Sequence, residues 1–213
     1  MTELVTLTDP RSAAAEAYRA LRTNLAFHNP AQPLRVVLIT SPTAAEDRAE
    51  VTGNLAVATA HAGRAVVALD ADLRRPALHT LFGVANDRGL AQVLAAPEGP
   101  LEAAATAVPT LRVVPAGPPP ADPAALLDGL ATGRILERLR AEADVVLVCA
   151  PPVLAVADAA VLAPLVDGVV LVLAAGRSRR DDARAAREAL DRVGARVLGV
   201  VLTDAEPAAD RRY

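Results

Sequence analysis

The chain contains no lysine and no tryptophan, and all 22 of its basic residues are arginine. Any mechanism that requires a lysine ammonium group is therefore excluded, although a GC-biased genome would by itself favour arginine over lysine. Only 2% of the residues are aromatic. The single cysteine, Cys149, rules out an intramolecular disulfide and a cysteine-based zinc site.

Long hydrophobic segments are also absent. The longest apolar runs, at residues 145–149 and 168–175, have the length of a strand, whereas a membrane-spanning helix needs about 20 apolar residues. Met1 is not followed by a basic and then apolar signal sequence. The net charge of −3 does not favour nucleic acid as a partner. These features predict a cytoplasmic protein with no membrane span of its own.

The composition is that of a globular protein. Hydrophobic residues make up 53% of the 213 residues and charged residues 22%, which disfavours intrinsic disorder. The length suits one domain. We therefore expect a single domain over residues 1–213, with flexible ends at residues 1–12 and 204–213.

Strand-like and helix-like segments alternate along the chain. Expected strands cover residues 34–40, 65–69, 111–115, 144–149, 168–174 and 196–203. Expected helices cover residues 13–28, 50–62, 77–82, 89–95, 124–141, 157–165 and 181–193. The segment at residues 124–141 is expected to form one or two helices, with Gly133 as the break. This alternation predicts an α/β fold, a three-layer sandwich with a mostly parallel sheet and helices on both faces.

In such a sheet, ligands bind beyond the carboxyl ends of the strands. Four segments are expected there, at residues 41–50, 70–76, 150–154 and 203–204. Three of them lie in or beside distinctive sequences, namely TSPT at residues 40–43, LDADLRRPALHTLFG at residues 69–83 and DVVLVCAPPVLAVADA at residues 144–159. A fourth distinctive segment, EAYRALRTNL at residues 16–25, precedes the first strand.

With these segments the chain resembles the cytoplasmic kinase domain of bacterial tyrosine autokinases (BY-kinases), which control capsule and exopolysaccharide synthesis. They are P-loop ATPases akin to septum-site and plasmid-partition ATPases. The resemblance extends from about residue 16 to residue 202. It implies a P-loop NTPase-like fold, ATP and Mg²⁺ as cofactors, and phosphate transfer to tyrosine.

The nucleotide-binding loop departs from the family pattern TSPTPGEGKST, because residues 40–50 read TSPTAAEDRAE. Ala45 and Asp47 replace glycines whose backbone freedom helps to cradle phosphates. Arg48 replaces the phosphate-binding lysine, and Ala49 replaces the hydroxyl that binds magnesium. By resemblance, the loop residues that would contact nucleotide are Thr43, Ala44, Ala45, Glu46, Asp47, Arg48, Ala49 and Glu50.

Two further nucleotide positions are altered. Cys149 stands where the family has an aspartate of the metal site; we expect a small buried hydrophobe there, with a reactive thiol as the alternative. Thr203 follows the last strand, where the family often carries an asparagine that contacts adenine. A threonine can still form a hydrogen bond, so this departure is the milder one.

The acidic motif of the family is retained as Asp70 and Asp72. The resemblance implies that these carboxylates serve magnesium and the attacking hydroxyl, as a vestigial catalytic pair. The alternative is a structural role, in which they accept hydrogen bonds from loop N–H groups or pair with Arg74 and Arg75. The altered loop favours the structural alternative.

Energies indicate how much the substitutions matter. Micromolar binding corresponds to about −8 kcal/mol, and hydrogen bonds to charged groups contribute roughly 1.5–3 kcal/mol each. Loss of the lysine, the hydroxyl and the carboxylate, with Asp47 repelling phosphate, would weaken binding to millimolar or beyond. We therefore expect no cofactor and no resident metal. The alternative is that the loop tolerates these substitutions and still binds ATP and Mg²⁺.

Three features concern partners and modification. Glu16, Arg19 and Arg22 reproduce the ExxRxxR motif through which the family assembles into rings, with a solvated helix face as the alternative. Tyr213, the last residue, is a candidate phosphoacceptor, because the family phosphorylates a C-terminal tyrosine cluster. The arginines near the last helix are expected to be solvated rather than to form a lipid or partner patch; they are Arg177, Arg179, Arg180, Arg184 and Arg187.

The sequence as a whole predicts a BY-kinase-like pseudokinase, an assembly or regulatory module of polysaccharide biosynthesis and export. The resemblance implies a membrane-bound co-polymerase as partner, which would recruit the protein to the inner face of the membrane. It also implies a homo-oligomer or a mixed ring with an active paralogue. The alternatives are an active tyrosine autokinase that uses Arg48, Asp70 and Asp72, and a partition-type ATPase relative.

Overall fold

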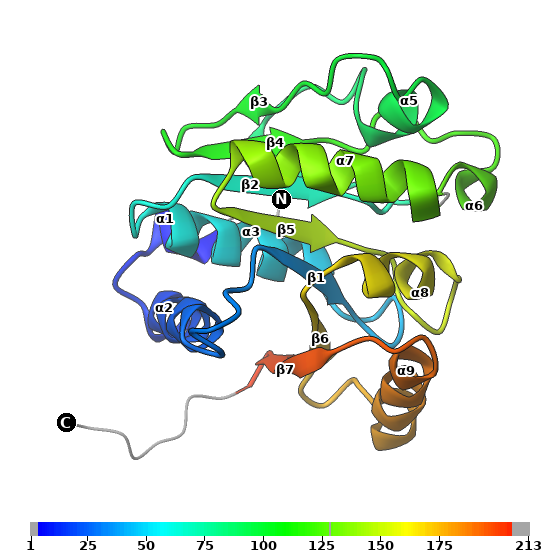
Figure 1. The fold of residues 1–213 in the computed structure, drawn as a ribbon. Helices are drawn as coiled ribbons and strands as arrows, with labels where there is room; N and C mark the ends of the chain where they lie inside the picture. Colours follow the sequence, from blue (N-terminus) through cyan, green and yellow to red (C-terminus); the bar gives the residue numbers. More distant parts are fainter. Residues whose placement is uncertain (1–3, 128, 206–213) are drawn as a thin grey trace.

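The computed structural model describes residues 4–127 and 129–205. Its centre is a seven-stranded sheet in the order β3-β4-β2-β5-β1-β6-β7, parallel except for β3 (Figure 1). The strands are β1 (Val36–Thr40), β2 (Val66–Asp70), β3 (Ala104–Ala105), β4 (Leu111–Val114), β5 (Val145–Cys149), β6 (Gly168–Ala174) and β7 (Val197–Thr203). The predicted mostly parallel α/β fold is confirmed.

The central strands are buried on both faces, which explains their continuous apolar sequences. Alternate residues of β1 point to opposite cores: Val36 and Leu38 join one cluster, and Val37 and Ile39 join the other. Val36 lies opposite Val146 of β5. β3 was not predicted, because two alanines at a sheet edge carry no strand pattern.

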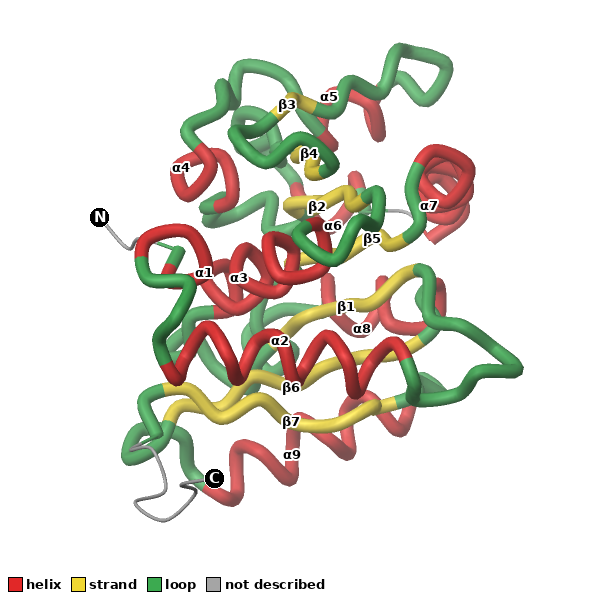
Figure 2. Tube along the Cα trace, turned by 90° about the vertical axis from the view of Figure 1, so that its left-hand side faces the viewer, coloured by secondary structure: helices red, strands yellow, loops and turns green. Residues whose placement is uncertain are grey.

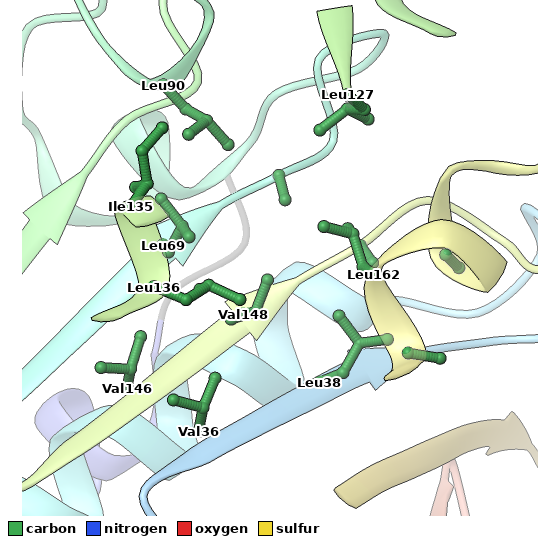
Figure 3. Close-up of a cluster of buried hydrophobic side chains, with 14 of the residues drawn as sticks. Val36, Leu38, Leu69, Leu90, Leu127, Ile135, Leu136, Val146, Val148 and Leu162 are labelled. Carbon is green, nitrogen blue, oxygen red and sulfur yellow. The ribbon is translucent and has the colours of Figure 1, made fainter. Parts of the chain in front are cut away.

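One face of the sheet is covered by α5 (Leu90–Ala95), α7 (Gly129–Glu142), α8 (Asp158–Leu162) and α9 (Arg180–Arg192) (Figure 1). Figure 3 shows this core, in which Ile135 and Leu136 of α7 lie above Val146 and Val148 of β5. Removing this apolar surface from water is the main contribution to stability.

The other face is covered by α1 (Val5–Thr8), α2 (Ala13–Ala26), α3 (Arg48–Ala60) and α4 (Leu78–Phe82). Figure 2 shows α2 in front of β6 and β7, with α3 beside β1. α3 is buried from Val51 to Ala60, so it forms the centre of this layer. Tyr18, Leu21 and Leu25 of α2 pack against the same core, as their helical spacing predicts.

Gly133 does not break a helix, so that prediction was wrong. α7 continues through Gly133, and the separate helix before it is α6 (Pro123–Leu126), which begins after the N-cap Asp122. A glycine inside a helix costs only about 1 kcal/mol relative to alanine. Burial of Ile135 and Leu139 outweighs that cost.

Residues 4–8, which include α1, lie against α3. Thr6 of α1 donates hydrogen bonds to Asn54 Oδ1 through its N–H, at 3.0 Å, and its hydroxyl, at 2.9 Å. Leu4 is buried over Gly53, where a Cβ atom would lie 2.7 Å from the leucine side chain. Glycine at this position therefore allows the close approach.

Within the described part of the chain, no helix is long and apolar enough to cross a membrane.

Candidate functional site

The carboxyl ends of β1, β2, β5 and β6 meet at one edge of the sheet, as the parallel topology requires. Backbone hydrogen bonds fasten the loops that follow them. Val153 N–H donates to Ser41 O at 2.9 Å, and Ala71 N–H donates to Cys149 O at 2.8 Å. The loops after three strands therefore form one connected surface.

The loop after β1 has relaxed torsions rather than a glycine-like conformation. Of the described non-glycine residues, only Asp204 has a positive φ. Ala45 and Asp47 therefore avoid the backbone strain that a left-handed conformation would impose on residues with a Cβ atom. Asp47 is the N-cap of α3 and accepts a hydrogen bond from Glu50 N–H at 3.0 Å. The substituted loop thus adopts a conformation suited to its own side chains.

Glu46 is buried inside this loop, with 3% of its surface exposed. One carboxylate oxygen accepts hydrogen bonds from the N–H and hydroxyl of Thr43, at 3.2 and 3.0 Å. The other accepts a hydrogen bond from Ser178 Oγ at 2.6 Å. Sequence reasoning missed Ser178, which lies outside every motif and would have been found only from its place after β6.

Arg48 points across the edge of the sheet. Its Nη2 lies 2.8 Å from Asp72 Oδ2, in an ion pair whose side chains are 12% and 4% exposed. Its Nε donates to Ala150 O at 2.9 Å. The residue at the lysine position therefore contacts the loops after β2 and β5.

Asp70 at the end of β2 is fully buried. It accepts hydrogen bonds from the N–H groups of Asp72, Ala77 and Leu78, at 3.2, 2.8 and 2.9 Å. Burial raises the pKa of Asp70 to about 6, against the opposite effect of these hydrogen bonds. The carboxylate thus holds the loop that leads into α4.

Asp72 accepts hydrogen bonds from Arg74 N–H and Arg75 N–H, at 3.2 and 2.9 Å, through the oxygen that does not face Arg48. The Arg74 side chain pairs instead with Asp158, at 3.0 Å. Both acidic residues of the motif are therefore engaged by backbone groups, and Asp72 is also engaged by a side chain that the sequence did not suggest.

Cys149 and Thr203 lie at the ends of β5 and β7. Cys149 is buried, and burial together with Asp70 raises the pKa of its thiol, which disfavours the thiolate that a reactive role requires. Thr203 is half-buried, and its hydroxyl donates to Leu173 O at 3.2 Å.

A cleft of about 1130 Å³ lies over this edge, between α2, the loop after β1 and β7. It brings together most of the expected nucleotide residues: Ala44, Ala45, Glu46, Asp47, Arg48, Ala49, Glu50, Asp72, Cys149 and Thr203. Thr43 and Asp70 do not line it. Burial, then the charges of Asp47 and Asp204, raise the pKa of Glu50 at its rim.

The residues present fit magnesium poorly. Ala49 and Cys149 offer no oxygen where the family pattern has a hydroxyl and a carboxylate. No group of three or more His, Cys, Asp or Glu side chains suited to a metal occurs within residues 4–127 and 129–205. The described residues therefore provide too few oxygen ligands to hold a magnesium ion.

The expected assembly motif lies on α2, away from the core. Arg19 pairs with Glu16 at 2.7 Å, with side chains 41% and 69% exposed, and also donates to Pro10 O. Arg22 donates to Thr23 Oγ1 at 2.9 Å. The motif is accessible, but its role in assembly remains a prediction. Tyr213 lies outside the described residues.

The arginines after β6 and along α9 are exposed, as expected for solvated side chains. Arg177 pairs with Asp204, and Arg187 pairs with Asp191 one helical turn later. These carboxylates offset part of the positive charge.

Comparison with known proteins agrees with this fold. The chain is 35% identical to the tyrosine-protein kinase YwqD of Bacillus subtilis over 211 residues, 99% of this chain and 89% of the relative. It is 34% identical to the putative tyrosine-protein kinase EpsB of Ralstonia solanacearum over 93% of this chain but only 26% of EpsB.

Among solved structures, the kinase domain of the Escherichia coli tyrosine kinase ETK superposes with a TM-score of 0.88 and 30% identity, covering 99% of this chain and 84% of that one. No profile of a known protein family matches the chain. The similarity to YwqD, over nearly the full length of both proteins, nevertheless decides the assignment: the chain belongs to the family of bacterial tyrosine-protein kinases.

Proposed function

We propose that the protein is a catalytically impaired member of this family, which acts as an assembly or regulatory module in capsule or exopolysaccharide biosynthesis. The observation that carries the proposal is the missing oxygen ligands. Ala49 at the start of α3 and Cys149 at the end of β5 stand where the family pattern has a magnesium-binding hydroxyl and carboxylate.

Electrostatics support the same proposal. Asp47, Glu50 and Asp204 lie close enough for the two aspartates to raise the pKa of Glu50, and all three line the cleft. A nucleotide phosphate entering there would meet carboxylates, and two unit charges about 4 Å apart repel by about 4 kcal/mol at an effective dielectric of about 20. This repulsion is comparable to the energy that two good hydrogen bonds would supply.

The alternative is an active ATP-dependent tyrosine autokinase of the same pathway. It is favoured by the retained acidic pair Asp70 and Asp72, and by Arg48, which keeps a positive charge at the lysine position. Arginine presents a planar fork rather than a compact ammonium, and here its fork is held by Asp72 and Ala150. A partition-type ATPase is disfavoured, because the chain has the family's acidic motif and α2 motif.

Partners follow from the family. We propose a membrane-bound co-polymerase subunit as the partner that recruits this protein to the inner face of the membrane. In EpsB, the matching region is only 26% of a longer chain, so in that relative it is joined to additional protein. We also propose self-assembly or a mixed ring with an active paralogue through Glu16, Arg19 and Arg22, and phosphorylation of Tyr213 in trans.

Calorimetric titration with MgADP and MgATP tests the proposal. We expect no heat of binding up to millimolar nucleotide, for the protein as it is and for Arg48→Lys, because the lysine alone does not restore the missing ligands. Radiolabelled ATP should likewise give no transfer to Tyr213, with Tyr213→Phe as the control. Micromolar binding, or transfer that Tyr213→Phe abolishes, would establish the active autokinase instead.

A further inference from the structure

Each of the three nitrogens of the Arg48 guanidinium already has a partner within the protein. Nη2 contacts Asp72 Oδ2 at 2.8 Å, and Nε donates to Ala150 O at 2.9 Å. Nη1 lies 3.3 Å from Glu46 O and 3.4 Å from Ser41 Oγ. A ligand entering the loop would therefore have to displace existing hydrogen bonds to reach this cation.

Asp72 is equally committed. Its Oδ2 faces Arg48, and its Oδ1 accepts hydrogen bonds from Arg74 N–H at 3.2 Å and Arg75 N–H at 2.9 Å. The side chains of Arg48 and Asp72 are 12% and 4% exposed. Screening by water is weak at such burial, and a charge-assisted hydrogen bond is correspondingly strong.

The pair also joins three loops that meet at the edge of the sheet. Arg48 begins α3 after the β1 loop, Asp72 follows β2, and Ala150 follows β5. Arg48 and Asp72 both line the cleft, so the ion pair lies where the loop opens to solvent. The contact therefore lies in the wall of the cleft and connects the loops that form this wall.

We propose that the Asp72 carboxylate is an internal occupant of the site after β1, which takes the place that a phosphate group would have on the Arg48 guanidinium. The carboxylate neutralises the guanidinium from within the protein, and their contact holds Arg48 against the loops after β2 and β5. This inference rests on the proposed function and names the side chains that close the site.

The first test is a double-mutant cycle with Arg48→Met, Asp72→Asn and the double variant, measured by urea unfolding. Each single change should lower the free energy of unfolding. The double variant should lose less free energy of unfolding than the sum of the two single losses. We expect a coupling of about tenfold in the unfolding constant, which is about 1.4 kcal/mol. Additive effects would contradict the proposal.

The second test separates occupancy from simple stabilisation. Asp72→Asn keeps an acceptor for the loop N–H groups but releases Arg48, so sodium pyrophosphate at about 10 mM should raise its thermal midpoint by roughly 3 °C relative to matched sodium chloride. The unmodified protein should not respond. Asp158→Asn is the matched control, since Asp158 is a buried partner of Arg74 at the same edge. An unresponsive Asp72→Asn, or an equal response of Asp158→Asn, would overturn the proposal.

Failure of this inference can be distinguished from failure of the proposed function. MgATP binding by the unmodified protein would refute the proposed function, whatever the coupling between Arg48 and Asp72. Absence of MgATP binding together with additive effects, or with no response of Asp72→Asn to pyrophosphate, would refute the internal occupant alone.

Discussion

Glu46 and Ser178 are separated by 132 positions in the sequence, yet Ser178 Oγ donates a hydrogen bond of 2.6 Å to Glu46 Oε1. Ser178 Oγ also accepts a hydrogen bond of 2.8 Å from Ala174 N–H. The hydroxyl therefore ties the loop after β1 to the end of β6. The buried carboxylate of Glu46 depends on this donor and on Thr43.

We predict that Ser178→Ala lowers the free energy of unfolding by about 1.5–3 kcal/mol, because a buried carboxylate oxygen loses a charge-assisted hydrogen bond. Urea unfolding at neutral pH measures the change, with an unchanged dependence on denaturant as evidence that the same structure unfolds.

Thr203→Val is the control for this prediction. It removes a hydroxyl at the same edge of the sheet, but that hydroxyl donates to a neutral acceptor, Leu173 O, at 3.2 Å. We expect Thr203→Val to lower the free energy of unfolding by only about 1 kcal/mol. If Ser178→Ala were no more destabilising than Thr203→Val, the bond to Glu46 would have no special importance.

Much of this fold could be predicted from sequence because buried parallel strands have continuous apolar runs, as in β1 and β5. The position of the candidate site could be predicted as well, because ligands of a parallel sheet bind at the carboxyl ends of its strands. The motifs also identified many of the residues that line the cleft, since loops at the carboxyl ends of neighbouring strands must meet.

The individual contacts could not be predicted in the same way. The partner of Arg48 depends on how closely the loops after β2 and β5 approach α3, and no local pattern encodes that distance. Ser178 was missed for the same reason. Gly133 was misjudged because its intrinsic helix propensity was considered without the burial of Ile135 and Leu139 on the same helix.

A second prediction concerns Asp167, which precedes β6. Its Oδ2 accepts hydrogen bonds from Arg35 N–H and Val36 N–H, at 2.8 and 2.7 Å, and its Oδ1 pairs with Arg140 at 2.9 Å. Burial alone would raise the pKa of Asp167, but Arg140 and the two N–H groups lower it overall. We predict that Asp167→Asn lowers the free energy of unfolding by about 1–3 kcal/mol.

Glu137→Gln is the matched control, because Glu137 also pairs with Arg140 but has a side chain that is 76% exposed. Loss of the ion pair between Glu137 and Arg140 should lower the free energy of unfolding by at most about 0.5 kcal/mol. Since the folded pKa of Asp167 is lowered, its contribution is present above the unfolded pKa and is lost as pH falls through the folded value. The difference between the unmodified protein and Asp167→Asn should therefore shrink in acid, and a constant difference at every pH would contradict this explanation.

A third prediction follows from the pKa of Asp70, which burial raises to about 6. The folded protein holds this proton when the unfolded chain has released it, so the contribution to stability is full below the unfolded pKa. It is lost as pH rises through about 6. The free energy of unfolding should fall between about pH 4 and pH 7, by up to about 3 kcal/mol from this group.

Urea unfolding across that range measures the dependence, and Asp70→Asn should flatten it. Glu50→Gln is the comparison, because the pKa of Glu50 is also raised by burial and by neighbouring carboxylates, but the residue lies at the rim of the cleft. Glu50→Gln should therefore reduce the pH dependence of the free energy of unfolding less than Asp70→Asn does. A flat profile for the unmodified protein would show that Asp70 remains ionised in the folded state throughout.

The last prediction concerns assembly through α2. The Glu16–Arg19 pair is exposed, and exposed ion pairs contribute little to stability. Arg19→Ala with Arg22→Ala should therefore leave the free energy of unfolding within about 0.5 kcal/mol while it abolishes oligomers in sedimentation velocity. Arg179→Ala with Arg180→Ala, which removes the same charge from the exposed start of α9, should leave assembly intact. Equal assembly by both double variants, or a monomeric unmodified protein, would contradict an interface at α2.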